Sequence, residues 1–316
     1  MIRYGLVFAA WGWRDLMRLH TAIVCVLMFV NANPVRQPEV HSTTPVAIEG
    51  VLLGTGFPAP DPDRAGPSNA VLVGEKLFIV DTGRGVTMRL AALKRRPSRV
   101  DAVFLTHLHS DHTADLPDLF STTWIMGRSK PLELYGPEGV AELAAGVRQF
   151  LAEDIHIRRD LTEKLPAAGA RISTHIVQPG LVYDDGEVKV IAFAVDHAPV
   201  KPAFGYRFEA HGRVIVFSGD YHPHEDTVAA VKDADVLVSE VYLPEYFDRV
   251  QKGESTERLK RYHCTPEQAG ELASKAKVKK LIFSHIIPAD GAEEIVRRAR
   301  KVFAGEVIAG KDLMRF

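Results

Sequence analysis

The residues best suited to chemistry lie in one short stretch, Thr106-His107-Leu108-His109-Ser110-Asp111-His112. It holds three histidines and one aspartate in the pattern His-x-His-x-Asp-His, directly after the apolar run Ala102-Val103-Phe104-Leu105, which is typical of a buried strand. The first two histidines are expected to face one cation, and the aspartate and last histidine a second. Neutral imidazole and carboxylate suit zinc and its neighbours, and no cysteine lies near enough for a closed structural zinc site. The stretch therefore predicts a metal site rather than an ordinary polar loop.

Three further candidate ligands each follow an apolar run. His197 follows residues 188–196, Asp220 follows 214–219, and His285 follows 281–284. A lone histidine after a strand is more often a surface or core residue than a ligand. Three such residues behind a complete first motif favour the ligand interpretation.

The order of these residues resembles the signature of the metallo-β-lactamase superfamily. Leu-Gly-Thr-Gly at 53–56, the run at 64–69, and a histidine leading into Gly-Tyr-Arg at 205–207 are similar to the branch that holds tRNase Z and arylsulfatase-like enzymes. The resemblance extends over most of the chain after the N-terminal segment. It implies a single α/β domain folded as a four-layer αββα sandwich, with the ligand loops along one edge between the sheets.

The resemblance also implies two divalent cations, Zn²⁺ in the first place, with iron or manganese as alternatives. One would be bound by His107, His109 and His197, the other by Asp111, His112 and His285, with Asp220 bridging them. Two cations roughly 3.5–4 Å apart lower the pKa of a shared water toward about 7. The hydroxide would attack a phosphorus, sulfur or carbonyl centre, and Asp111 is counted among the catalytic residues as well as the ligands.

Three residues outside the ligand set are expected to assist. Glu240 ends an apolar run, and His263 precedes a helix whose start is marked by Thr265 and Gln268, spaced as a capping box. In the family that the sequence resembles, the equivalent glutamate orients a histidine that protonates the leaving oxygen. Asp81 is expected to accept a hydrogen bond from a ligand imidazole. The alternatives are a surface glutamate, a histidine beside a helix cap and an ordinary turn aspartate.

Two departures from the family pattern bear on the substrate. Only 22 residues separate His197 from Asp220, where tRNA-processing members insert a long arm that grips tRNA, and residues 208–213 predict a simple hairpin turn. After His285 comes Ile286-Ile287-Pro288, not the Ser-x-Arg-Tyr run of tRNase Z. These features favour a small phosphodiester or sulfate ester. Ribonuclease Z-like 3′ processing of tRNA and lactone or carboxylic ester hydrolysis are the alternatives.

Composition places limits on the class of protein. A hydrophobic content of 46% and a charged content of 25% are typical of a globular protein with a substantial core. The formal net charge of −1 excludes a strongly basic nucleic-acid binder, though not a local basic patch, so nucleic acid is disfavoured as a partner. The sequence leaves open whether the chain forms a homodimer. Two cysteines, Cys25 and Cys264, give no disulfide framework.

The N-terminal residues predict a targeting segment rather than part of the fold. A basic flank precedes a nine-residue apolar run at 22–30, which is shorter than the about 20 residues that span a bilayer. A secretory signal is expected, and with it a periplasmic or secreted enzyme; an uncleaved anchor and a start at Met17 are alternatives. The predicted organisation is a signal or anchor at 1–32, a linker at 33–45 and the hydrolase domain at 46–316.

The remaining elements alternate as a layered α/β fold requires. Helices are expected at 84–93 and 138–151, and strands at 46–53, 70–73, 77–80, 171–177, 187–195, 203–209 and 212–218. Residues 153–165 are charged and irregular, which predicts a loop that places Arg158 and Arg159 at the rim of a cleft.

Overall fold

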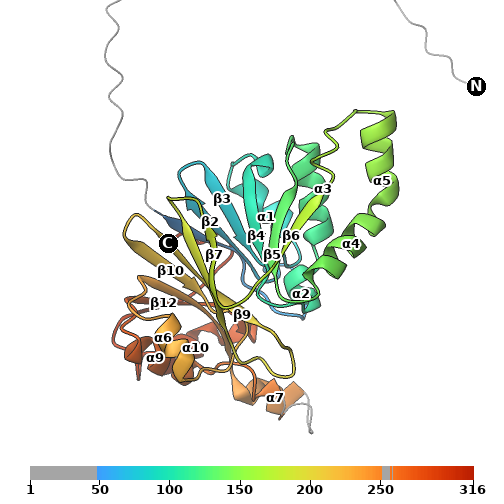
Figure 1. Cartoon of the computed structure of the whole chain (residues 1–316). Coiled ribbons are helices and arrows are strands. Elements are labelled where there is room, and N and C mark those ends of the chain that lie inside the picture. Colours follow the sequence, from blue (N-terminus) through green and yellow to red (C-terminus); the bar gives the residue numbers. More distant parts are fainter. Residues whose placement is uncertain (1–47, 251–256, 258) are drawn as a thin grey trace, which may run out of the picture. The chain divides into compact units, whose positions relative to one another are not determined.

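The fold is described by a computed structural model over residues 48–250, 257 and 259–316 (Figure 1). The predicted signal segment and linker lie outside these residues. Among the residues described, no helix is both long enough and apolar enough to cross a membrane.

The first of two β-sheets carries the predicted metal motif. It has six strands in the order β1-β2-β3-β4-β5-β6, of which the pairs β1–β2 and β2–β3 are antiparallel and the rest parallel. The strands are β1 (Glu49–Gly54), β2 (Ser68–Val73), β3 (Lys76–Val80), β4 (Val100–Phe104), β5 (Leu132–Gly136) and β6 (Ile172–Ile176).

The second sheet has seven strands in the order β13-β12-β11-β10-β9-β8-β7. Strands β10 to β13 run parallel, whereas β7 to β10 form antiparallel pairs. The strands are β7 (Gly180–Asp184), β8 (Lys189–Ala194), β9 (Phe204–Ala210), β10 (Arg213–Phe217), β11 (Val236–Tyr242), β12 (Lys280–Ile287) and β13 (Glu306–Ala309).

Both faces of the central strands are buried, which explains their continuous apolar runs. In β3, Leu77 and Ile79 point into the outer core beneath the helices, whereas Phe78 points into the core between the sheets. The two sheets meet through aromatic contacts, and the rings of Phe104 on β4 and Phe208 on β9 lie 5.5 Å apart. These packed strands supply a firm base for the loops at their ends.

Helices cover the outer face of each sheet (Figure 1). On the first sheet these are α1 (Val86–Ala92), α3 (Leu116–Ile125) and α4 (Val140–Phe150), and on the second α6 (Glu225–Ala230), α9 (Pro266–Lys275) and α10 (Ala292–Ala299). The order helix, sheet, sheet, helix confirms the predicted four-layer αββα fold. The predicted capping box is also present, because Thr265 accepts a hydrogen bond from the Gln268 amide and the Gln268 side chain accepts one from the Thr265 amide.

One segment differs from the sequence prediction. Residues expected to form an irregular loop instead form α5 (Ala152–His156) and a π-helical turn (Ile157–Leu161). Arg158 donates to Asp154 at 2.8 Å and to Glu163 at 2.6 Å, so its charge stabilises this helical extension rather than standing at the rim of a cleft. Ion pairs four residues apart favour a helix, and this signal outweighed the high polarity that predicted a loop.

Candidate metal centre

The His-x-His-x-Asp-His motif occupies the loop after β4 and the short helix α2 (Ser110–Thr113). This loop packs tightly against two others, at 54–67 and 81–85. A Cβ atom on Gly83 would lie 2.6 Å from the carbonyl oxygen of Asp111 and 2.5 Å from the carbonyl carbon of Gly66, so only glycine permits this contact. The packing of the backbone thus fixes the position of the His-x-His-x-Asp-His motif without any bound metal.

The other predicted site residues come from the second sheet. His197 follows β8 and Asp220 follows β10, as expected from the sequence. Glu240 and His285 were expected where their strands end, but β11 and β12 both continue for two residues beyond them. The register of the β11–β12 pair shifts at Glu240, and His285 has a φ of 45°. An irregularity of this kind turns a side chain out of the ladder, which explains how both residues reach the site from within a strand.

Three imidazoles converge on one point. His109 Nδ1 lies 2.9 Å from His107 Nε2 and 3.4 Å from His197 Nε2. Asp220 Oδ2 lies 4.0 Å from His107 Nε2 and 3.9 Å from His197 Nε2. Ligands in a tetrahedron about 2.0–2.1 Å from a zinc ion are about 3.3 Å from one another. These nitrogen atoms therefore have the spacing of ligands to a shared cation.

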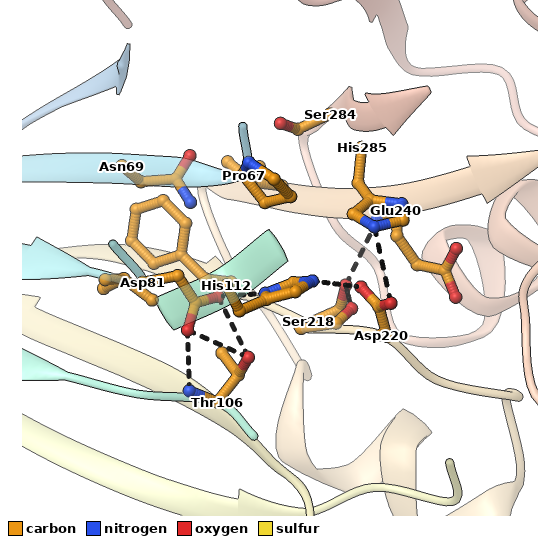
Figure 2. A pocket seen from close by; sticks show the side chains of 14 residues that line it. Pro67, Asn69, Asp81, Thr106, His112, Ser218, Asp220, Glu240, Ser284 and His285 are labelled. Atoms are coloured by element: carbon orange, nitrogen blue, oxygen red, sulfur yellow. Dashed lines mark hydrogen bonds and ion pairs between the residues drawn. The ribbon is translucent and has the colours of Figure 1, made fainter. Parts of the chain in front are cut away.

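A second cluster adjoins the first through Asp220. Its Oδ1 lies 3.3 Å from His112 Nε2 and its Oδ2 lies 3.5 Å from His285 Nε2, as the dashed lines in Figure 2 show. Asp111 Oδ2 completes the group, 3.3 Å from His285 Nε2 and 3.6 Å from His112 Nε2. Asp220 therefore lies between the two clusters, with Oδ2 near residues of both and Oδ1 toward His112 of the second.

The chemistry of these atoms fits divalent cations. Nitrogen atoms of five imidazoles and oxygen atoms of two carboxylates crowd together here, and all of these residues except the exposed His109 are buried. The buried Nε2 of His112 has no hydrogen-bond partner among the described residues. Leaving a buried polar atom unpaired costs free energy. A cation bound at each cluster would pair with the nitrogen and oxygen atoms there. The site therefore suits divalent metal binding.

Burial and neighbouring charges perturb the titration of these groups. Burial, reinforced by His112, holds the pKa of His107 well below its usual value, so this imidazole is neutral and able to bind metal. Burial alone would raise the pKa of Asp111, but the hydrogen bond with His285 and the charge of His112 lower it to about 2. Asp111 is therefore a carboxylate across the physiological pH range.

Asp81 holds one of these imidazoles in place. Its carboxylate accepts a hydrogen bond from His112 Nδ1 at 2.9 Å and from the backbone amide and hydroxyl of Thr106 (Figure 2). The first of these bonds keeps a hydrogen on Nδ1, so Nε2 is the nitrogen that would bind a cation. This is the position that the expected supporting role requires.

Asp81→Asn should weaken metal binding by about 10–100-fold without removing a ligand, because the imidazole would lose its fixed tautomer and orientation. Metal affinity measured by competition with a chromogenic chelator tests this expectation. Asp101→Asn serves as a matched control, since Asp101 lies outside both clusters and accepts a hydrogen bond from the Leu77 amide. Equal affinities for wild type and Asp81→Asn would contradict the role.

Glu240 and His263 form a second pair beside the clusters. The Glu240 carboxylate accepts a hydrogen bond from His263 Nδ1 at 2.9 and 3.0 Å, and both side chains are buried. This bond leaves Nε2 of His263 as the nitrogen available to a bound substrate. Burial, with a further contribution from Asp220, raises the pKa of Glu240 well above its usual value. Burial lowers the pKa of His263.

A cavity of about 330 Å³ opens beside the clusters. Its lining includes the polar groups His109, Asp111, Asp220, His263 and His285. The rest of the lining is apolar or aromatic and consists of Phe57, Pro58, Ala59, Tyr246, Leu259, Tyr262 and Ile287, here called the apolar wall. A substrate could thus place its reacting group at the metal site and an apolar group against this wall.

Side chains from distant parts of the sequence hold the apolar wall in place. Arg84 donates to the carbonyl oxygens of Phe57 at 3.2 Å and Pro58 at 2.9 Å. Asp312, near the C-terminus, accepts from the backbone amide of Thr55 at 3.0 Å and from its hydroxyl at 2.9 Å. These bonds fix the backbone of the loop that carries Phe57 and Pro58 in the wall.

The sequence did not identify the apolar wall. The glycines and prolines at 54–60 predict only a tight loop. Tyr246 and Tyr262 give no signal, because a single aromatic residue in a polar stretch has many structural roles. Only the tertiary structure brings these side chains to one cavity.

Comparisons with known proteins agree with this geometry. A family model described as a beta-lactamase superfamily domain matches residues 77–286. A protein of Mycobacterium bovis (strain BCG / Pasteur 1173P2) named Ribonuclease Z is 36% identical over 278 residues, which cover 85% of this chain and 97% of that protein. A Ribonuclease Z of Mycobacterium avium (strain 104) is 38% identical over the same shares.

Solved structures show the same fold. The metallo-beta-lactamase fold protein YhfI of Bacillus subtilis superposes with a TM-score of 0.67 at 21% identity, covering 85% of this chain and 98% of that one. The short form of human tRNase Z superposes with a TM-score of 0.63 at 24% identity over the same shares.

Proposed function

The chain belongs to the metallo-β-lactamase superfamily, in the branch that includes ribonuclease Z, and from this we propose a divalent-metal-dependent phosphodiesterase that cleaves RNA. One observation supports the hydrolytic activity most strongly. Two ligand clusters meet at Asp220, and His263 lines the same cavity without belonging to the predicted ligand set. Structural zinc sites close all their positions and need no separate proton donor.

The proposed ligand sets share one residue. His107, His109 and His197 would hold one ion and Asp111, His112 and His285 the other, with Asp220 contributing to both. When bound, divalent cations supply Lewis-acid chemistry, since they neutralise charge on a phosphoryl group and lower the pKa of water toward about 7. We propose that the ions are zinc, because imidazole nitrogen predominates among the ligands.

His263 is proposed to protonate the leaving oxygen. For this step the imidazole must carry hydrogens on both nitrogens, a form that burial opposes and the negative charge of Asp220 favours. Its Nε2 hydrogen would then pass to that oxygen as the phosphorus–oxygen bond breaks, while the Nδ1 hydrogen stays in the bond to Glu240. Glu240 would stabilise the cationic imidazole before the transfer and keep the ring directed at the cavity. An alkoxide leaving group, such as a ribose oxygen, needs this proton most.

Two findings favour different substrates: the names of the relatives favour RNA, and the hairpin between β9 and β10 favours a small phosphodiester. The relatives named Ribonuclease Z match this chain over 97% of their own length, which supports RNA, and specifically 3′ processing of tRNA. These names also favour a phosphorus centre over the sulfur or carbonyl centres left open by the sequence. A small phosphodiester is the second candidate, and the hairpin between β9 and β10 favours it. Only His211 and Gly212 join these strands, so no tRNA-binding arm extends between them.

A cleavage assay distinguishes the two candidates. The full chain, loaded with metal, is incubated at low salt with a 3′-extended tRNA, and the products are mapped at nucleotide resolution beside reactions on bis-p-nitrophenyl phosphate. We expect one cut at the mature 3′ end of the tRNA. The rate should fall as salt rises, because phosphate contacts release counterions.

Rapid hydrolysis of the small diester with intact tRNA at every salt concentration would replace the RNA substrate by the second candidate. Failure to cleave either substrate while metal is bound would refute the phosphodiesterase proposal.

A further inference from the structure

The apolar wall is larger and more aromatic than phosphoryl chemistry alone requires. Phe57 and Tyr246 contact edge to face, with ring centroids 6.3 Å apart and planes at 88°. Both pack on a small apolar cluster with the buried Tyr242 and Ile287. Phe57 and Tyr246 come from different elements, the loop after β1 and α7 (Pro244–Val250). Their convergence at one cavity indicates a surface built for a flat apolar group.

The wall is continuous with the reactive groups. The ring of Tyr262 lies 5.1 Å from the ring of the predicted ligand His197 and 5.0 Å from the ring of His263, and the Tyr262 carbonyl accepts a hydrogen bond from His197 Nδ1 at 3.0 Å. A group that rests on the wall is therefore attached close to the phosphorus atom that reacts.

The size of the cavity limits what fits. A volume of about 330 Å³ is at the lower end of the range of about 300–1,000 Å³ that is typical of small-molecule pockets. This volume suits one nucleoside rather than several stacked nucleotides. The fixed position of Phe57, whose carbonyl is held by Arg84, means that little ordering is needed when a planar group binds.

We propose that the apolar wall is a subsite for one nucleobase next to the scissile phosphodiester, with Phe57 as its main stacking residue. The inference rests on the proposed function, because RNA is the substrate that brings both a phosphodiester and a nucleobase. It adds a specificity determinant: the enzyme recognises the base beside the bond, not the phosphate alone. Stacking on an aromatic ring tolerates any of the four bases, so this subsite selects nucleotides without selecting sequence.

Binding measurements test the subsite without requiring turnover. Isothermal calorimetry on the metal-loaded full chain compares adenosine 5′-monophosphate and adenosine 3′-monophosphate with ribose 5-phosphate and phenyl phosphate. We expect at least one of the nucleotides to bind about 5–150-fold more tightly than ribose 5-phosphate, the range that stacking of one base on an aromatic side chain provides. Equal affinities for the nucleotides and ribose 5-phosphate would overturn the proposal. Tighter binding of phenyl phosphate would assign the wall to aryl groups instead.

Variants at Phe57 test whether this side chain is the one that stacks on the nucleobase. Phe57→Ala and Phe57→Leu should lose this preference while ribose 5-phosphate binds as before, which shows that the phosphate site is intact. Phe57→Tyr should keep it. Phe150→Ala is a matched control, because Phe150 on α4 is 78% exposed and far from the cavity. Full preference in Phe57→Leu would mean that apolar volume, not stacking, is recognised and would refute the assigned role.

Hydrolysis separates this inference from the proposed function. Thymidine 5′-p-nitrophenyl phosphate and methyl p-nitrophenyl phosphate release the same phenolate, so their kcat/KM ratio reports the nucleoside alone. A high ratio in wild type that falls in Phe57→Ala supports the subsite. Hydrolysis of both at equal rates would preserve the phosphodiesterase and refute the subsite. Nucleotide preference in calorimetry without hydrolysis of any diester would refute the phosphodiesterase and preserve the subsite.

Discussion

Asp220→Ala is expected to release both metal ions and to reduce hydrolysis to the level of the buffer blank. The Asp220 carboxylate lies near both clusters: its Oδ1 is 3.3 Å from His112 Nε2 in the second cluster, and its Oδ2 is 3.9 Å from His197 Nε2 in the first. Its loss leaves each ion short of a ligand and removes the negative charge that holds two cations together. Elemental analysis and initial rates on a phosphodiester measure both effects.

The control for this variant is Asp226→Ala, since the Asp226 side chain is 94% exposed on α6 and lies outside both clusters. It should bind metal and turn over as wild type does. Thermal unfolding of Asp220→Ala should remain cooperative, because the two sheets and their helices supply most of the apolar burial. Two full equivalents of metal retained in Asp220→Ala would contradict the assignment of the bridge.

His263→Ala should keep both metals and lose about 10²–10⁴-fold in rate on diesters with poor leaving groups. A phenolate with a low pKa leaves without help, so its loss should be smaller. The measurement is the dependence of log kcat/KM on leaving-group pKa, which should become steeper in the variant. A uniform loss across the series would show that His263 binds substrate or supports the fold rather than donating a proton.

Glu240→Gln is the companion variant. A glutamine can still accept the hydrogen bond from His263 Nδ1, which the structure places at 2.9 Å, but it carries no charge to stabilise the imidazolium. We expect the same dependence on the leaving group in a weaker form, with metal content unchanged. A larger loss than in His263→Ala would point to a separate role for Glu240 beside Asp220 and His285, with which it also forms a close group.

The metal loop was predictable because its information is local. Four residues within six positions after a buried strand encode both the ligand types and their directions, and the structure brings them together with His197, Asp220 and His285. The structure places Glu240 and His285 beside the metal loop, but their strands were expected to end there. The sequence carries no clear mark of the irregularity at Glu240, because apolar residues continue on both sides of it.

The substrate cavity was not predictable for the opposite reason. Phe57 lies far along the chain from Tyr246 and Tyr262, and no periodicity connects the three. The same applies to Arg84 and Asp312, which no sequence pattern marks but which fix the loop that carries Phe57. Contacts between distant segments depend on the whole fold, and a pattern read along one segment does not contain them.

The most direct test of a metal-dependent phosphodiesterase is reconstitution of the chelated protein. The full chain is treated with a chelator, shown by elemental analysis to be free of metal, and titrated with Zn²⁺ or Mn²⁺ while hydrolysis of bis-p-nitrophenyl phosphate is recorded. We expect no activity without metal and full activity at about two equivalents per chain, as two-metal hydrolases require. Undiminished activity in the metal-free protein, or saturation of activity at one equivalent, would contradict the two-metal centre.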